Sequence, residues 1–157
     1  MPRIIKNRRN HLINRIRWPA QRQKKDVMAV RISKQKIKRF IKYWIPVIFC
    51  GIIIFLISAI PASRMPNIFT YQDVVGHLSE YTLFGLLWIR AFKEYYPRQS
   101  FTRRLIWIFL FVLIYAILDE LHQLFVPGRV AGWDDVGMDM LGLLLANLIV
   151  YDKDPAI

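Results

Sequence analysis

Residues 43–60 form a run of 18 residues without charge, YWIPVIFCGIIIFLISAI. About 20 apolar residues cross the hydrocarbon core of a bilayer, so the run is long enough to span it. A secretory signal peptide is the alternative, because a basic stretch precedes the run, but the apolar core of such a peptide is about 7–15 residues long. We therefore predict a retained transmembrane helix and an integral membrane protein.

Three further apolar segments follow, at residues 73–90, 105–118 (with a polar continuation to 125) and 136–151. The first is interrupted by His77 and Glu80, and the last by Asp139. Such interruptions are tolerated when the polar face looks into a bundle instead of toward lipid. The four segments predict an all-α fold, a membrane helical bundle of about four transmembrane helices with a basic N-terminal tail.

Positive charge is concentrated before the first apolar run. Residues 1–43 hold 15 of the 23 lysines and arginines and a single acidic residue, in a chain of net charge +12. This predicts a basic cytoplasmic segment at residues 1–42 and a transmembrane domain at residues 43–151. Anionic lipid is the expected partner of the basic segment. Nucleic acid is not expected, because the segment has no zinc-ligand pattern and too few apolar residues for a packed core.

Met28 opens a compact basic lead into the first apolar run, MAVRISKQKIKRF, whereas residues 1–27 show little periodicity. We hypothesise that translation starts at Met28 and that residues 1–27 are a mis-assigned start, which the intact mass of the native protein would test.

Basic residues in the short loops predict the orientation in the membrane. The loops after the first and third segments carry one each, Arg64 and Arg129. The loop between the second and third segments carries Arg90, Lys93, Arg98, Arg103 and Arg104. Because basic loops stay in the cytoplasm, we predict a multi-pass protein of the cell membrane with both termini cytoplasmic.

Polar side chains gather at the outward end of this predicted bundle. In the second segment they are spaced by four and three residues, so they share one helix face. The candidate binding cluster consists of Asp73, His77, Glu80, Asp119, Glu120, Gln123, Arg129, Asp135 and Asp139. A charged group at membrane depth costs about 2.5–3.5 kcal/mol on insertion scales, so it is kept when it is paired, hydrated or functional. The alternatives are hydration at the interface for Asp73, Asp119, Asp134 and Asp135, and structural contacts of His77 with Glu80 and of Glu120 with Gln123 and Arg129.

The cluster does not by itself identify a chemistry. Imidazole and carboxylate groups are acceptable metal ligands, but no tight motif such as His-Glu-x-x-His is present, and the lone Cys50 offers no cysteine motif. No metal site is therefore predicted. Carboxylates and a histidine in a partly dry site suit proton transfer, although no phosphate loop or nucleophile elbow accompanies them. The sequence identifies neither a cofactor nor a catalytic residue.

Small and turn-forming residues predict how the last two segments meet. Pro127 and Gly128 predict a tight reversal between them. Gly137, Gly142 and Ala146 predict a small-residue stripe that lets the fourth helix pack closely against a neighbour.

At these residues the chain resembles the VanZ-like family of bacterial membrane proteins. The resemblance covers residues 44–150 and rests on Asp73-x-x-x-His77-x-x-Glu80-Tyr81-x-x-x-Gly85, on Leu118-Asp119-Glu120-x-x-Gln123-x-Phe125-x-Pro127-Gly128-Arg129 and on Asp135-x-x-x-Asp139-x-x-Gly142. The family is named for a protein associated with low-level teicoplanin resistance. The resemblance thus implies a cell-envelope protein linked to antibiotic resistance, without a defined biochemical activity. Two positions depart from the family pattern: Val74, where Lys is frequent, and Asp139, where Asn is usual.

Three functions are compatible with these features. The first is a non-enzymatic envelope protein in which Arg129, through its planar fork, and the surrounding acids bind a lipid headgroup or a cell-wall precursor. The alternative is a membrane-embedded enzyme that acts on a lipid-linked phosphate substrate, with His77 or Glu120 as acid or base. A small transporter is the third, and it would need an oligomer because no broken-helix repeat is evident.

Overall fold

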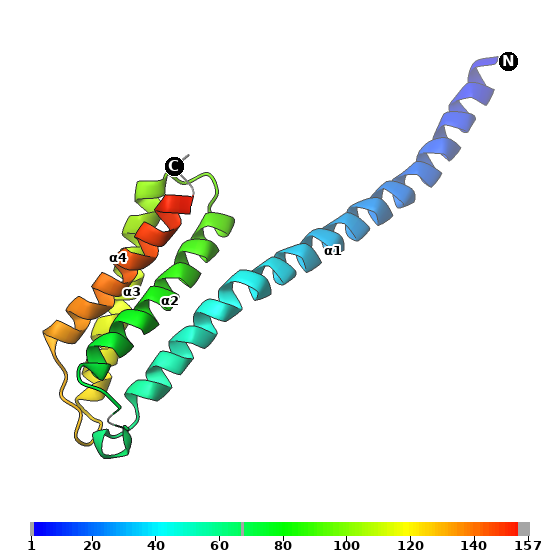
Figure 1. Ribbon diagram of the computed structural model, residues 1–157. Coiled ribbons are helices and arrows are strands. Elements are labelled where there is room, and N and C mark those ends of the chain that lie inside the picture. Colours follow the sequence, from blue (N-terminus) through cyan, green and yellow to red (C-terminus); the bar gives the residue numbers. More distant parts are fainter. Residues whose placement is uncertain (1, 67, 154–157) are drawn as a thin grey trace. The chain divides into compact units, whose positions relative to one another are not determined.

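The computed structural model describes the backbone of residues 2–66 and 68–153 and the side chains of 22–66 and 68–150. These parts are helical and contain no strand, which confirms the predicted all-α class. In chain order the elements are α1 (Pro2–Ser58), the 3-10 turn η1 (Ala62–Arg64), α2 (Gln72–Tyr95), α3 (Phe101–Gln123) and α4 (Trp133–Lys153) (Figure 1). The chain divides into two compact units, Met1–Ile41 and Lys42–Ile157, and α1 runs through both.

The first helix is longer than the apolar run that predicted it. It begins at Pro2 and includes the basic segment, because lysine, arginine, glutamine and leucine are good helix formers even where no apolar stripe is present. It ends at Ser58. Pro61 disfavours helical geometry for the residue before it, which limits any extension.

Apolar side chains face outward on three of the four helices. Large exposed hydrophobic residues are frequent on the 45–56 part of α1, on α3 and on α4, and few on α2, where Val75 and Leu83 are exposed. Among the described residues, two helices are long and apolar enough to cross a membrane, the Arg22–Ser58 part of α1 and all of α3. A largely apolar exposed surface, with the few buried polar residues kept inside the bundle, is the arrangement expected of a protein embedded in lipid.

The closest packing joins α2 and α4 through small residues. A Cβ added at Gly142 would lie 2.7 Å from the Leu78 carbonyl oxygen and 2.9 Å from the Thr82 nitrogen, so this glycine lies directly against the backbone of α2. Gly85 of α2 packs in turn against Ala146 of α4. Gly142 and Ala146 therefore pack as predicted. The expectation for Gly137 was wrong, since a Cβ there would meet nothing within 4 Å.

The connections α1–α2 and α3–α4 lie together at one end of the bundle, which we call the loop end, and the α2–α3 connection lies at the other (Figure 1). The Ala62 amide donates to the Pro127 carbonyl at 3.2 Å and ties the two connections together. The Arg129 amide donates to the Val126 carbonyl at 3.1 Å, and Gly128 has φ +78°. This is the predicted tight reversal, with proline first and a left-handed glycine second.

Candidate functional site

Arg129 closes the end of the first helix. Its Nε donates to the Ile60 carbonyl at 3.1 Å, and its Nη2 donates to the Ile57 carbonyl at 3.2 Å. The last carbonyls of a helix have no partner within the helix, so a cation is favourable there. Two of the guanidinium's N–H groups are thus occupied by backbone. The expected pair between Arg129 and Glu120 is replaced by this helix cap.

Asp119 is buried. It is 3% exposed, so the alternative in which interfacial water hydrates it is wrong. The Ser58 hydroxyl donates to Asp119 Oδ2 at 2.6 Å and joins the last residue of α1 to the end of α3. A short hydrogen bond to a carboxylate is stronger than one between neutral groups, so this contact fixes how α1 and α3 meet.

His77 contacts a carboxylate of α4. Its Nδ1 lies 2.9 Å from Oδ1 of Asp139, with the His77 side chain 13% exposed and the Asp139 side chain fully buried. Both residues belong to the predicted cluster, but the predicted partner of His77 was Glu80. The pairing joins α2 to α4 across the face that carries Gly142, where the helices are closest.

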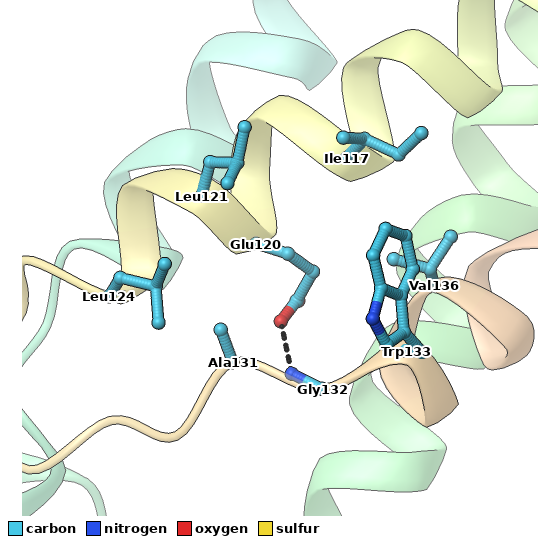
Figure 2. Close-up of a pocket in the computed structure, with 8 residues that line it drawn as sticks. All are labelled: Ile117, Glu120, Leu121, Leu124, Ala131, Gly132, Trp133 and Val136. Carbon is cyan, nitrogen blue, oxygen red and sulfur yellow. Dashed lines mark hydrogen bonds between the residues drawn. The ribbon is translucent and has the colours of Figure 1, made fainter.

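Glu120 faces the start of α4. Its Oε2 accepts from the Gly132 amide at 3.0 Å and its Oε1 accepts from Gln123 Nε2 at 3.2 Å. Figure 2 shows the carboxylate pointing from α3 toward Gly132, with the Trp133 ring beside it. This carboxylate forms part of the wall of a largely apolar cavity of about 240 Å³ whose other lining residues are Ile117, Leu121, Leu124, Ala131, Gly132, Trp133 and Val136.

A second, more polar cavity of about 180 Å³ lies at the loop end. Five of the nine predicted cluster residues line it: Asp73, His77, Glu80, Gln123 and Arg129. Ser58 and Gly76 also contribute to its wall. Asp73 is exposed, so contact with water is enough to explain a charged residue at this position. The structure thus gathers side chains from α1, α2, α3 and the α3–α4 connection around one partly open space.

Several buried polar atoms of this region have no hydrogen-bond partner within the described residues. They are the Tyr81 hydroxyl, Asp119 Oδ1, Asp139 Oδ2 and His122 Nε2. A buried polar atom without a partner is uncommon and calls for a physical reason. Two contributors to the region, Ser58 and the Gly132 amide, were not predicted from the sequence. Ser58 had a detectable signal, because it is a hydroxyl near the end of an otherwise apolar run.

Replacing Ser58 by alanine is expected to lower the stability of the folded bundle. The Asp119 carboxylate would stay buried but lose a hydrogen bond, which costs about 1–3 kcal/mol. Thermal unfolding of the full chain in detergent measures this effect. The matched control is Ser63→Ala, because Ser63 is exposed in η1. Equal melting temperatures for the two variants would contradict the proposed strength of the Ser58–Asp119 bond.

A model of the family described as VanZ/LLP1 matches residues 29–152, which include all of α2 and α3. Searches of curated proteins and of solved structures gave no match.

Proposed function

This chain belongs to the VanZ/LLP1 family, and on that premise we propose that it binds the headgroup of a lipid, or of a lipid-linked envelope precursor, at its loop end. The family and the two helices apolar enough to span a bilayer make it a membrane protein. The observation that carries the binding proposal is the polar cavity lined by five residues of the cluster. Those residues face a shared space large enough for part of a headgroup.

The lining of the polar cavity indicates what kind of headgroup fits. A guanidinium has five N–H groups, and Arg129 uses two of them on the carbonyls of Ile57 and Ile60, which leaves three for a phosphate. Asp73 and Glu80 offer carboxylate oxygens that accept hydrogen bonds from hydroxyl or ammonium groups. A headgroup that combines phosphate with such donors satisfies both sides of the cavity.

The apolar cavity beside Glu120 supports an amphiphilic ligand. Its wall is mostly aliphatic and aromatic, which suits part of an acyl or prenyl chain. The Glu120–Gln123 hydrogen bond joins a residue of the apolar wall to a residue of the polar wall. A ligand with a polar head and an apolar chain therefore has chemically matched surfaces close to each other.

We further propose a multi-pass arrangement with both termini in the cytoplasm and the loop end outside. The α2–α3 connection and its flanks carry the basic residues that favour the cytoplasmic side, and this connection lies at the bundle end opposite the loop end (Figure 1). The basic N-terminal segment would then meet anionic lipid of the inner leaflet. A precursor headgroup bound at the outer face would link the protein to glycopeptide resistance.

Filling the polar cavity is expected to reduce headgroup binding. Gly76 lines the cavity, and a Cβ added there meets nothing within 4 Å, so Gly76→Leu places a side chain in open space. Native mass spectrometry of the full chain in detergent would count bound phosphatidylglycerol, with diacylglycerol of the same acyl chains as the comparison without phosphate. We expect phosphatidylglycerol binding to fall at least about tenfold, the effect of losing about 1.4 kcal/mol.

The control is Gly137→Leu, because Gly137 also has open space around its Cβ but does not line the polar cavity. Both variants keep the basic N-terminal segment, so charge attraction to that segment is the same in each. Equal binding by the two variants, or equal binding of phosphatidylglycerol and diacylglycerol by the wild type, would contradict the proposed function.

The second candidate function, acid–base catalysis on a lipid-linked phosphate, is favoured by the His77–Asp139 contact. An imidazole held by a carboxylate through one nitrogen presents its other nitrogen to a substrate, as in general-base sites. In that case Glu120→Gln is expected to abolish turnover, whereas a pure binding protein would lose only part of its affinity.

A further inference from the structure

The three helices α2, α3 and α4 each contribute one metal-ligating side chain to a single point. His77, Glu120 and Asp139 place one ligand atom each within 4.8 Å of the other two. The three residues are far apart in sequence, so the bundle itself brings them together. Glu120 and Asp139 are buried, at 6% and 0% exposure.

Several carboxylates act on one another around this point. Asp135 acts electrostatically on both His77 and Asp139, and Asp119 acts on Asp139. Arg129 acts electrostatically on Glu80 and Asp135, but its hydrogen bonds go to the carbonyls of Ile57 and Ile60 and not to a carboxylate. Burying several carboxylates together is costly unless positive charge compensates them. A cation bound among them would provide this compensation.

A second observation is independent of the clustering of acids. Oδ2 of Asp139 is fully buried and has no hydrogen-bond partner within the described residues, and the same holds for the buried Tyr81 hydroxyl. Asp139 is the charged group that acts most strongly on that hydroxyl. Native structures rarely leave such atoms unpaired unless an ion or water satisfies them. The free carboxylate oxygen belongs to a residue that already meets a second potential ligand, His77.

From this geometry we propose that His77, Glu120 and Asp139 bind a divalent transition-metal ion such as Zn²⁺. The separation of 2.9 Å between His77 Nδ1 and Asp139 Oδ1 is close to the roughly 3.0–3.4 Å between neighbouring ligands at metal bonds of about 2.1 Å. A carboxylate oxygen of Glu120 lies within 4.8 Å of both ligand atoms. One imidazole and two carboxylates suit Zn²⁺ or Mn²⁺ better than Ca²⁺ or Mg²⁺, which take mainly oxygen ligands.

Three protein ligands leave at least one position on such a metal for water or another oxygen ligand. Of the proposed ligands, His77 lines the polar cavity and Glu120 lines the apolar one. If the proposed headgroup binding holds, a phosphate oxygen fits this position. Metal binding itself follows from the three side chains and does not depend on the headgroup.

Metal uptake by the full chain tests the proposal. The protein is purified in detergent, stripped with a chelator and titrated with Zn²⁺ in the absence of added lipid. We expect about one Zn²⁺ per chain, with affinity at least tenfold lower in His77→Ala and in Glu120→Gln. Asp134→Asn is the matched control, because Asp134 is an exposed acid in the first turn of α4 and is outside the ligand set. No uptake by the wild type, or unchanged affinity in both variants, would overturn the site.

A measurement on the wild type alone tests the proposal even if the variants fail to fold. X-ray absorption of the Zn²⁺-loaded chain is expected to show imidazole nitrogen and carboxylate oxygen around the metal. A sulfur neighbour, which would place the ion at Cys50, or a shell without imidazole would contradict the assignment. Because no lipid is present in the metal titration, metal can bind even if phosphatidylglycerol does not. The two experiments therefore test the two proposals separately.

Discussion

Replacing Gly142 by leucine is expected to separate α2 from α4 and to unfold the loop end of the bundle. A Cβ at this position would come within 2.7–3.1 Å of three backbone atoms of α2, at Leu78, Tyr81 and Thr82. Backbone cannot move aside as a flexible side chain can, so a whole leucine costs at least about 3 kcal/mol. The melting temperature should fall by roughly 6–12 °C for a chain of this length.

The comparison variant is Gly137→Leu, on the same helix and with the same change in volume. Its Cβ meets nothing within 4 Å, so we expect a change of less than about 0.5 kcal/mol, typical of surface substitutions. Thermal unfolding in detergent, followed by circular dichroism, measures both variants. Similar melting temperatures for Gly142→Leu and the wild type would show that the close α2–α4 contact is not maintained in the folded protein.

Much of the fold was predictable because a helix that crosses a bilayer needs about 20 predominantly apolar residues, and such runs are visible in the sequence. The uncharged run at 43–60 and the apolar segment at 105–118 correspond to the parts of α1 and α3 that are long and apolar enough to cross it. The helical N-terminal segment was not predicted, because it has helix-forming residues but no apolar periodicity. Helix propensity without an apolar stripe gives only a weak signal.

The spacing of the small residues in α4 already indicates which of them face α2. Gly142 and Ala146 are four residues apart and share a face, whereas Gly137 lies about 140° around the helix from Gly142 at 3.6 residues per turn. That geometry excludes Gly137 from the stripe. Asp139, three residues before Gly142, falls on the α2-facing side by the same reasoning.

The membership of the cluster was more predictable than its pairing. Polar residues at membrane depth are conspicuous in sequence, and five of the nine line one cavity. Which of them touch depends on the register between helices, and local sequence does not encode that register. The contact of His77 with Asp139 and the cap formed by Arg129 on α1 both span more than 60 residues and arise only from packing.

The central claim is that the cluster at the loop end is a working site and not a structural ion network. We expect His77→Ala and Glu120→Gln to weaken function, because both residues contribute to the proposed ligand and metal contacts. Arg129→Ala is less specific, since it also removes the cap of α1. Asp135→Asn, at a partly buried acid beside His77, should weaken function, whereas Asp134→Asn, at an exposed neighbour, should not.

The most direct measurement is complementation in a strain that lacks this gene, scoring susceptibility to envelope-directed glycopeptides for each variant after checking its amount in the membrane. We expect His77→Ala and Glu120→Gln to reach the membrane at wild-type levels and fail to restore the wild-type response, while Asp134→Asn restores it. Wild-type responses from well-expressed His77→Ala and Glu120→Gln would instead assign the cluster a purely structural role.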